Sequence, residues 1–220
     1  MATSPWRESN GPIRDLISET LIEWDVKVHH MSHVTLPTTR FSVADFERMV
    51  EADVFGTERV ELINGRVYRM PAQLDPHMMA IAKTNRALLA VVPQSEVLFV
   101  QGTIKLDPFT AVDPDFMWIA AAVGTPEHQR PAPLLVIEVS HTTYKKDGGI
   151  KLRKYAQFGI RDYWIENLNE DQIEVYRDPV NPTGKSSGCK FATVRHCKRG
   201  ESISPLQRPA VSLAVDDLLP

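Results

Sequence analysis

One glutamate lies inside the most apolar run of this chain, Leu134–Ser140. The run reads Leu-Leu-Val-Ile-Glu-Val-Ser, and its composition predicts a central strand that is covered on both faces. The carboxylate of Glu138 would be costly to bury there without a cation or hydrogen-bond donors. It is therefore either the partner of a buried Arg or Lys, or a functional group such as a metal ligand or general base. The sequence leaves both interpretations open.

Two aspartates flank a proline shortly before this run. Asp113 and Asp115 enclose Pro114, and Asp115 begins a predicted strand over residues 115–120. Asp-Pro is common in turns, so we expect Asp113 only to shape the entry to the strand. Asp115 could face the strand that carries Glu138. Two carboxylates at strand ends are ligands that Mg²⁺ prefers, so we expect Mg²⁺ as the cofactor, with Mn²⁺ as a substitute.

A basic segment follows the apolar run. Asp147 is expected to cap a helix that ends at Phe158, with Lys151 and Tyr155 on one face of that helix. The segment holds six basic residues against Asp147 alone, an excess of five: Lys145, Lys146, Lys151, Arg153, Lys154 and Arg161. A second basic group comprises Lys185, Lys190, Arg195, Lys198 and Arg199. Such runs are usually solvated, but beside an acidic site they favour a partner with a phosphate backbone.

The order of the predicted elements indicates an α/β (α+β) domain with a mixed sheet. Helices are predicted over residues 42–52 and 77–92, with a hairpin at Asn64-Gly65 between them. Strands are then predicted over these ranges: 97–100, 103–106, 115–120, 134–140, 161–165, 172–176, 190–196 and 210–215. We expect residues 38–220 to form a single domain. Residues 1–37 are an N-terminal extension with an apolar stripe at helical spacing, which predicts an amphipathic helix.

Composition and sequence pattern indicate the cellular compartment and the general class of protein. The net charge of −3 gives no global sign of nucleic-acid binding, which must then rest on local patches. The N-terminal sequence has no signal-peptide pattern, and no apolar run reaches the roughly 20 residues that span a bilayer. Two cysteines, Cys189 and Cys197, exclude a disulfide framework. We therefore expect a cytoplasmic protein without membrane contact.

Taken together, these residues resemble the Uma-type family of predicted restriction endonucleases, a branch of the PD-(D/E)xK nuclease superfamily. The resemblance covers about residues 41–176. It is carried, in this order, by Val60 to Gly65, His77, Pro114-Asp115, Val136 to Ser140, Asp147, Lys151 to Tyr155, and Gly159 to Trp164.

The resemblance implies a restriction-endonuclease-like core, with a mixed central sheet flanked by helices. It implies that Asp115 and Glu138 bind the metal. The superfamily lysine normally lies two residues after the second acid, where this chain has Ser140. In this respect the chain resembles the Uma-type branch, which has a lysine on the following helix. Lys151 matches that lysine by its spacing to Tyr155. Glu61 and His77 match recurring positions of the family.

The function expected from these residues is a metal-dependent endonuclease that hydrolyses DNA phosphodiester bonds. Magnesium held by Asp115 and Glu138 would lower the pKa of a bound water. Lys151 would orient that water or stabilise charge on the phosphate oxygens. His77 and Glu61 could bind a second metal or relay a proton.

Two alternatives remain at this stage. A catalytically inactive nuclease-fold protein could bind nucleic acid or a partner protein and keep the acids as a structural ion pair. A metal-dependent hydrolase of another phosphoester is the second alternative. For duplex cleavage we expect a homodimer, because two strands need two sites.

Overall fold

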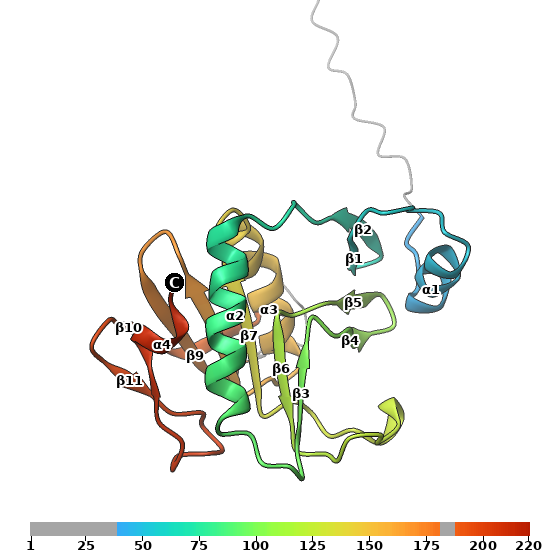
Figure 1. Ribbon diagram of the computed structural model, residues 1–220. Helices are drawn as coiled ribbons and strands as arrows, with labels where there is room; N and C mark the ends of the chain where they lie inside the picture. The colour runs from blue at the N-terminus through green and yellow to red at the C-terminus, as the bar shows by residue number, and fades with distance from the viewer. Residues whose placement is uncertain (1–38, 181–187) are drawn as a thin grey trace, which may run out of the picture. The chain divides into compact units, whose positions relative to one another are not determined.

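A six-stranded sheet forms the centre of the described chain, which in this computed structural model comprises residues 39–180 and 188–220 (Figure 1). Its strand order is β10-β9-β8-β7-β6-β3. The strands are β3 (Val97–Val100), β6 (Phe116–Ile119), β7 (Leu135–Ser140), β8 (Asp162–Asn167), β9 (Gln172–Val180) and β10 (Lys190–Lys198). Strands β7 and β8 are parallel, and the other neighbours are antiparallel. The expectation of a mixed central sheet is confirmed.

A second, four-stranded sheet has the order β2-β1-β5-β4. Its strands are β1 (Val60–Ile63), β2 (Arg66–Arg69), β4 (Ile104–Asp107) and β5 (Thr110–Val112). The predicted hairpin joins β1 to β2, and both turn residues have positive φ, 54° at Asn64 and 75° at Gly65. Asn and Gly tolerate that conformation at the two central positions of a tight hairpin turn. Strand β5 was not among the predicted strands, and it leads directly into Asp113.

Helices cover both faces of the central sheet (Figure 1). Helices α2 (Asp75–Leu89) and α4 (Val215–Leu218) pack on the face that carries Trp118, Ile137 and Trp164. Helix α3 (Leu152–Gln157) packs on the opposite face, with strands of the second sheet. Strand β7 is therefore buried along its whole length, as predicted. The expected core, a mixed sheet flanked by helices, is observed.

The first helix, α1 (Val43–Glu51), begins where the sequence predicted. The side chain of Ser42 accepts a hydrogen bond from the amide of Asp45, and the carboxylate of Asp45 accepts one from the amide of Ser42. Each side chain satisfies an amide that the first helical turn leaves without a partner. This capping box fixes the start of the helix.

The helix expected to begin at Asp147 is different in the structure. A π-helical segment, η2 (Lys146–Lys151), precedes α3, and Asp147 makes no capping bond because it lies inside this segment. The prediction of Asp147 as a helix cap was wrong, since the chain is already helical from Tyr144. A short 3₁₀ helix, η1 (Glu127–Gln129), lies in the predicted loop before β7.

The C-terminal region also departs from the prediction. The strand expected over residues 210–215 is limited to β12 (Leu213–Ala214), which pairs with β11 (Ser202–Ile203) and is followed at once by α4. Strand β9 continues to Val180, into a segment expected to be a loop. The expected N-terminal extension, residues 1–37, and Lys185 lie outside the described residues. None of the helices in the described ranges has the length and apolar character needed to cross a membrane.

Candidate active site

A cavity of about 30 Å³ lies beside the ends of β6 and β7, next to the start of α2 and to η2. Its wall includes four carboxylates, from Asp113, Asp115, Glu138 and Asp147. The imidazoles of His77 and His141 also line it. One water needs about 10–15 Å³ of such space, so the cavity has room for water or a small ion.

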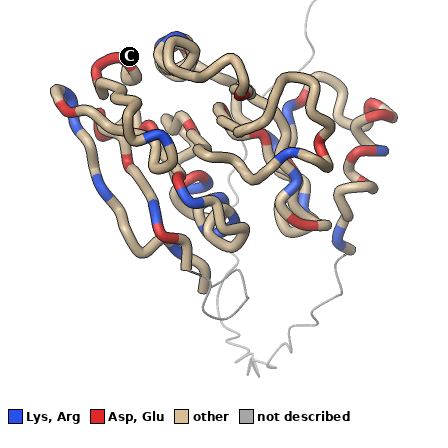
Figure 2. Tube along the Cα trace, turned by 90° about the horizontal axis from the view of Figure 1, so that it is seen from below, with Lys and Arg blue, Asp and Glu red and all other residues tan. Residues whose placement is uncertain are grey.

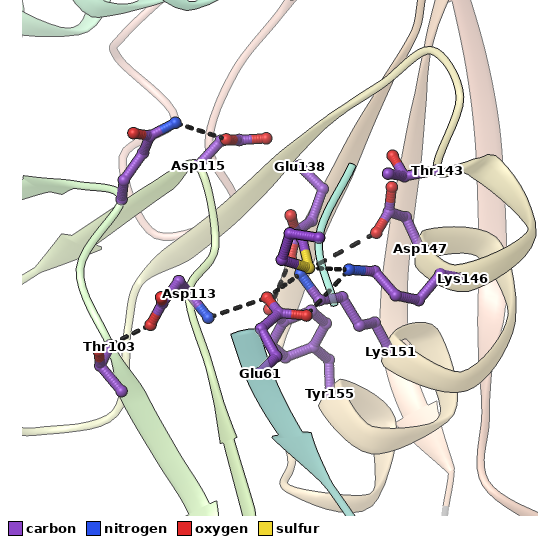
Figure 3. Close-up of polar contacts among 12 residues, drawn as sticks. Glu61, Thr103, Asp113, Asp115, Glu138, Thr143, Lys146, Asp147, Lys151 and Tyr155 are labelled. Carbon is purple, nitrogen blue, oxygen red and sulfur yellow. Dashed lines mark hydrogen bonds and ion pairs between the residues drawn. The ribbon is translucent and has the colours of Figure 1, made fainter. Parts of the chain in front are cut away.

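Glu138 is held by two hydrogen-bond donors from the following helical segment. Its Oε1 atom accepts from Nζ of Lys151 at 2.7 Å and from Oη of Tyr155 at 2.8 Å (Figure 3). The side chain is almost fully buried. Burial raises the pKa of Glu138 to about 8; the charge of Lys151 lowers it, whereas Asp147, Asp115 and Glu61 raise it further. The predicted buried cation partner of Glu138 is therefore present, and it is Lys151.

Lys151 binds two acids at once. Its Nζ atom lies 2.8 Å from Oε1 of Glu61, in addition to its bond with Glu138, and 4.0 Å from Oδ1 of Asp147. Only 1% of its side chain is exposed. Burial lowers its pKa, but the three carboxylates outweigh burial, and the resulting pKa lies above the usual value for lysine. Lys151 is thus a protonated, enclosed bridge, and it is not among the residues that line the cavity.

Glu61 connects the hairpin to this cluster. It lies on β1, where Oε1 accepts from the amide of Asp113 at 3.1 Å and Oε2 accepts from Nζ of Lys146 at 2.9 Å. Burial would raise its pKa, but Lys151 and Lys146 together hold the pKa of Glu61 below its usual value. Glu61 therefore stays ionised behind the cavity wall and anchors both lysines.

Asp115 is the second acid that the sequence assigned to the metal. Its Oδ2 atom accepts from the amide of Val139 at 2.9 Å, and the side chain of Gln101 donates to Oδ1 at 3.3 Å. Nε2 of His77 lies 3.3 Å from Oδ2. Burial opposes ionisation, yet the bonds from His77 and Val139 bring the pKa of Asp115 below its usual value. Asp115, which directly precedes β6, and Glu138 on the neighbouring β7 both reach the cavity.

Two further acids line the same wall. Asp113, expected only to shape a turn, accepts a hydrogen bond from Oγ1 of Thr103 at 2.7 Å and also faces the cavity. Asp147 was predicted as a cap; instead, its side chain is buried at the cavity, and burial raises its pKa. Its spacing of four residues from Lys151 was the available signal, because a helix brings those positions together.

Half of the basic residues in the segment after β7 are paired with acids. Three of its lysines bind internal acids: Lys151 binds Glu61 and Glu138, Lys146 binds Glu61, and Lys154 binds Asp107 at 2.8 Å. In the second basic group, Arg195 pairs with Glu201, and Arg199 pairs with Asp171. Basic and acidic positions are interspersed along the trace (Figure 2). Part of the charge of these two runs is therefore paired within the chain, and the expected partner with a phosphate backbone stays a prediction.

The cavity can be tested for its fit to the expected magnesium ion. In residues 39–180 and 188–220, no group of three or more His, Cys, Asp or Glu side chains is placed to hold a metal together. Mg²⁺ does not require such a cage, because it keeps several waters and is usually bound by one or two carboxylates. Asp115 and Glu138 supply hard oxygen donors in a cavity with room for water. They therefore fit this mode of Mg²⁺ binding.

The mixed sheet, with acids at the ends of adjacent strands and a lysine on the next helix, defines a protein with a restriction-endonuclease-like nuclease fold. The profile of the Uma2 family, described as "Putative restriction endonuclease", matches residues 43–215. The chain therefore belongs to the Uma2 family, and the resemblance seen in the sequence is confirmed.

A solved structure has the same fold. It is described as a "putative nuclease" of the DUF820 family from Anabaena variabilis, and it superposes with a TM-score of 0.60 at 16% sequence identity. The match covers 81% of this chain and 97% of that chain. At this identity the likeness establishes the fold alone. Comparison with curated proteins gives no match.

Proposed function

We propose that this chain is a magnesium-dependent endonuclease that hydrolyses phosphodiester bonds of DNA at the cavity. The observation that most supports this is the pair of acids, Asp115 and Glu138, on one wall of a cavity that has room for water. Membership in a family described as "Putative restriction endonuclease" supports the same class of reaction.

The residues that would hold the ion are Asp115 and Glu138. The bonds from Lys151 and Tyr155 both end on Oε1 of Glu138, so we assign Oε2 to the ion. When bound there, Mg²⁺ would supply electrophilic polarisation of the scissile phosphate and a bound water of lowered pKa.

The remaining residues orient the acids and can move a proton. Lys151 and Tyr155 fix the carboxylate of Glu138, and Glu61 holds Lys151 from its other side. His77 faces Asp115 through Nε2, while its buried Nδ1 has no hydrogen-bond partner among the described residues. Since a neutral imidazole can accept a proton at one nitrogen, we assign proton transfer with the cavity water to His77.

Incubation of the purified protein with supercoiled plasmid DNA tests this proposal. Nicking or linearisation is expected with Mg²⁺ or Mn²⁺ and is expected to stop with EDTA. Glu138→Gln should lower the cleavage rate by about 100-fold or more, because it removes a carboxylate that would hold the ion at the reacting centre. Asp53→Asn, at an exposed position away from the cavity, is the matched control. Absence of cleavage by the wild type, or full cleavage by Glu138→Gln, would contradict the proposal.

One observation favours a second function, a nuclease-fold protein that binds nucleic acid or a partner protein without cutting. Lys151 is ion-paired with both Glu61 and Glu138, as in a structural ion-pair cluster. Calorimetric titration with Mn²⁺ separates the two functions, because only the endonuclease requires a metal at these acids.

The assembly and the substrate class can be tested in the same preparation. We propose that duplex cleavage uses a homodimer, which light scattering with and without duplex DNA would detect. A small chromogenic phosphodiester distinguishes a DNA enzyme from another phosphoesterase. Duplex DNA should inhibit its hydrolysis only if both bind the same site.

A further inference from the structure

Lys151 is enclosed, so a different cationic side chain could be the one that contacts a substrate phosphate. Both of its short contacts, at 2.7 and 2.8 Å, go to carboxylates, and its side chain is 1% exposed. Reaching a phosphate would require Lys151 to leave Glu138 or Glu61 inside a buried cluster. Separating such a pair leaves an uncompensated buried charge, which is strongly unfavourable. Lys151 is accordingly a positioning residue in this arrangement.

Lys146 has a different set of contacts. Its Nζ atom binds Oε2 of Glu61 at 2.9 Å and also contacts the sulfur of Met70, and 18% of its side chain is exposed. An ammonium group has three donors, and a thioether is a weak acceptor. A phosphate oxygen is a much stronger acceptor for the same proton, because the bond is then charge-assisted.

Position favours the same residue. Met70 and Asp147 line the cavity. Lys146, like Lys151, is not among the lining residues, but it directly precedes Asp147 and its ammonium contacts the sulfur of Met70. The ammonium of Lys146 therefore lies beside the cavity wall. The bond to Glu61 stays intact when the thioether is displaced, so Lys146 need not break its ion pair to bind an anion.

We propose that Lys146, and not Lys151, is the ammonium group that contacts a substrate phosphate, and that the phosphate takes the place of the Met70 sulfur. This inference rests on the proposed endonuclease function and assigns its phosphate-binding residue. Sequence reasoning selected Lys151 from its spacing to Tyr155. Lys146 was counted only as part of a charge run.

The salt dependence of DNA binding tests the assignment. Binding of a labelled duplex is measured by fluorescence anisotropy in Ca²⁺, used as a substitute ion to prevent cleavage, over a series of salt concentrations. Each phosphate contact contributes about −0.9 to the slope of log K against log salt concentration. Lys146→Gln should weaken binding and reduce the steepness of that slope by about 1. Lys146→Arg keeps the charge and should restore the slope.

One variant serves as the control. Lys105→Gln removes a partly exposed lysine that also pairs with carboxylates, Glu47 and Glu127, and should leave the slope unchanged. Circular dichroism verifies that each variant is folded.

The outcomes separate this inference from the function on which it rests. Wild-type cleavage together with an unchanged slope in Lys146→Gln would overturn the assignment of Lys146 alone. A wild type that neither binds nor cleaves DNA would overturn the proposed function and this inference with it. Wild-type cleavage with a slope reduced by about 1 in Lys146→Gln, restored by Lys146→Arg, is the supporting result.

Discussion

Nζ of Lys151 lies 2.7 Å from Oε1 of Glu138, and both side chains are buried between the central sheet and the segment that follows β7. The pair joins residues 13 positions apart, one on a strand and one on a helical segment. Glu61 reaches the same ammonium from the second sheet. This bridge connects the two sheets at the cavity, and it explains how a glutamate is stable inside an apolar strand.

Replacing Lys151 alone should lower the free energy of unfolding more than replacing Lys151 and Glu138 together. Lys151→Met leaves Glu138 and Glu61 without this buried partner, and we expect a loss of about 3–5 kcal/mol in the free energy of unfolding. Urea denaturation measures it. The double variant Lys151→Met with Glu138→Gln should recover part of the loss. A single variant within about 0.5 kcal/mol of the wild type, the range of ordinary surface substitutions, would show that the bridge is not structural.

A second buried acid predicts a pH dependence of stability. Glu166 on β8 accepts a hydrogen bond from Thr84 at 2.7 Å, and burial raises its pKa from 4.5 to about 8. Between those values the folded chain binds a proton that the unfolded chain has released, so stability is lost as pH rises toward 8. The full change is on the order of 3–5 kcal/mol.

Glu166→Gln removes this titration. Its free energy of unfolding, compared with that of the wild type from pH 5 to pH 9, should show a smaller decline as pH rises. The difference between the two curves isolates Glu166 from other groups that titrate in the range. Parallel curves would show that Glu166 is ionised in the folded state.

The hairpin turn predicts a position where alanine is not tolerated. Gly65 has a φ of +75°, and a Cβ atom added there would lie 2.7 Å from Cβ of Arg40 and 3.1 Å from the carbonyl oxygen of Phe41. Gly124, with a φ of +89°, has open space around the same added atom. Both substitutions carry the backbone cost of about 1–2 kcal/mol, and Gly65→Ala should cost more because of the contacts. Equal losses of stability for Gly65→Ala and Gly124→Ala in thermal denaturation would show that an added Cβ atom at position 65 is not crowded.

The elements that the sequence predicted well are those with local signals. Ser42 and Asp45 cap the same helix from three residues apart, and Asn64-Gly65 specifies a two-residue turn. The apolar run around Glu138 is long enough to mark a buried strand. Each of these signals depends on residues close together in the chain, so no knowledge of tertiary contacts is needed.

The features that were missed depend on distant partners. Strand β5 has three residues and is stabilised by β1 and β4 on either side. Lys146 has the sequence context of a surface charge, but in the fold it binds Glu61, 85 positions away. Lys154 is neutralised by Asp107 in the same manner, across 47 positions. Charge runs cannot reveal such burial, because the acids that cause it lie in other elements.

The sequence predicted which residues form the site better than it predicted what each of them does. His77, Asp115 and Glu138 line one cavity, whereas Glu61 and Lys151 lie in the ion-pair cluster next to it. Asp147 completes the wall, although its sequence context indicated a helix cap. Which acids bind a metal is a question of affinity that measurement can answer.

Mn²⁺ binding by electron paramagnetic resonance tests the metal assignment most directly, because it does not require turnover. The wild type should bind one Mn²⁺ per chain that Mg²⁺ displaces. Asp115→Asn and Glu138→Gln should each abolish this binding. Asp75→Asn, an exposed position at the start of α2, is the control and should bind as the wild type does. Wild-type protein without Mn²⁺ binding, or Glu138→Gln with undiminished binding, would contradict a metal held by Asp115 and Glu138.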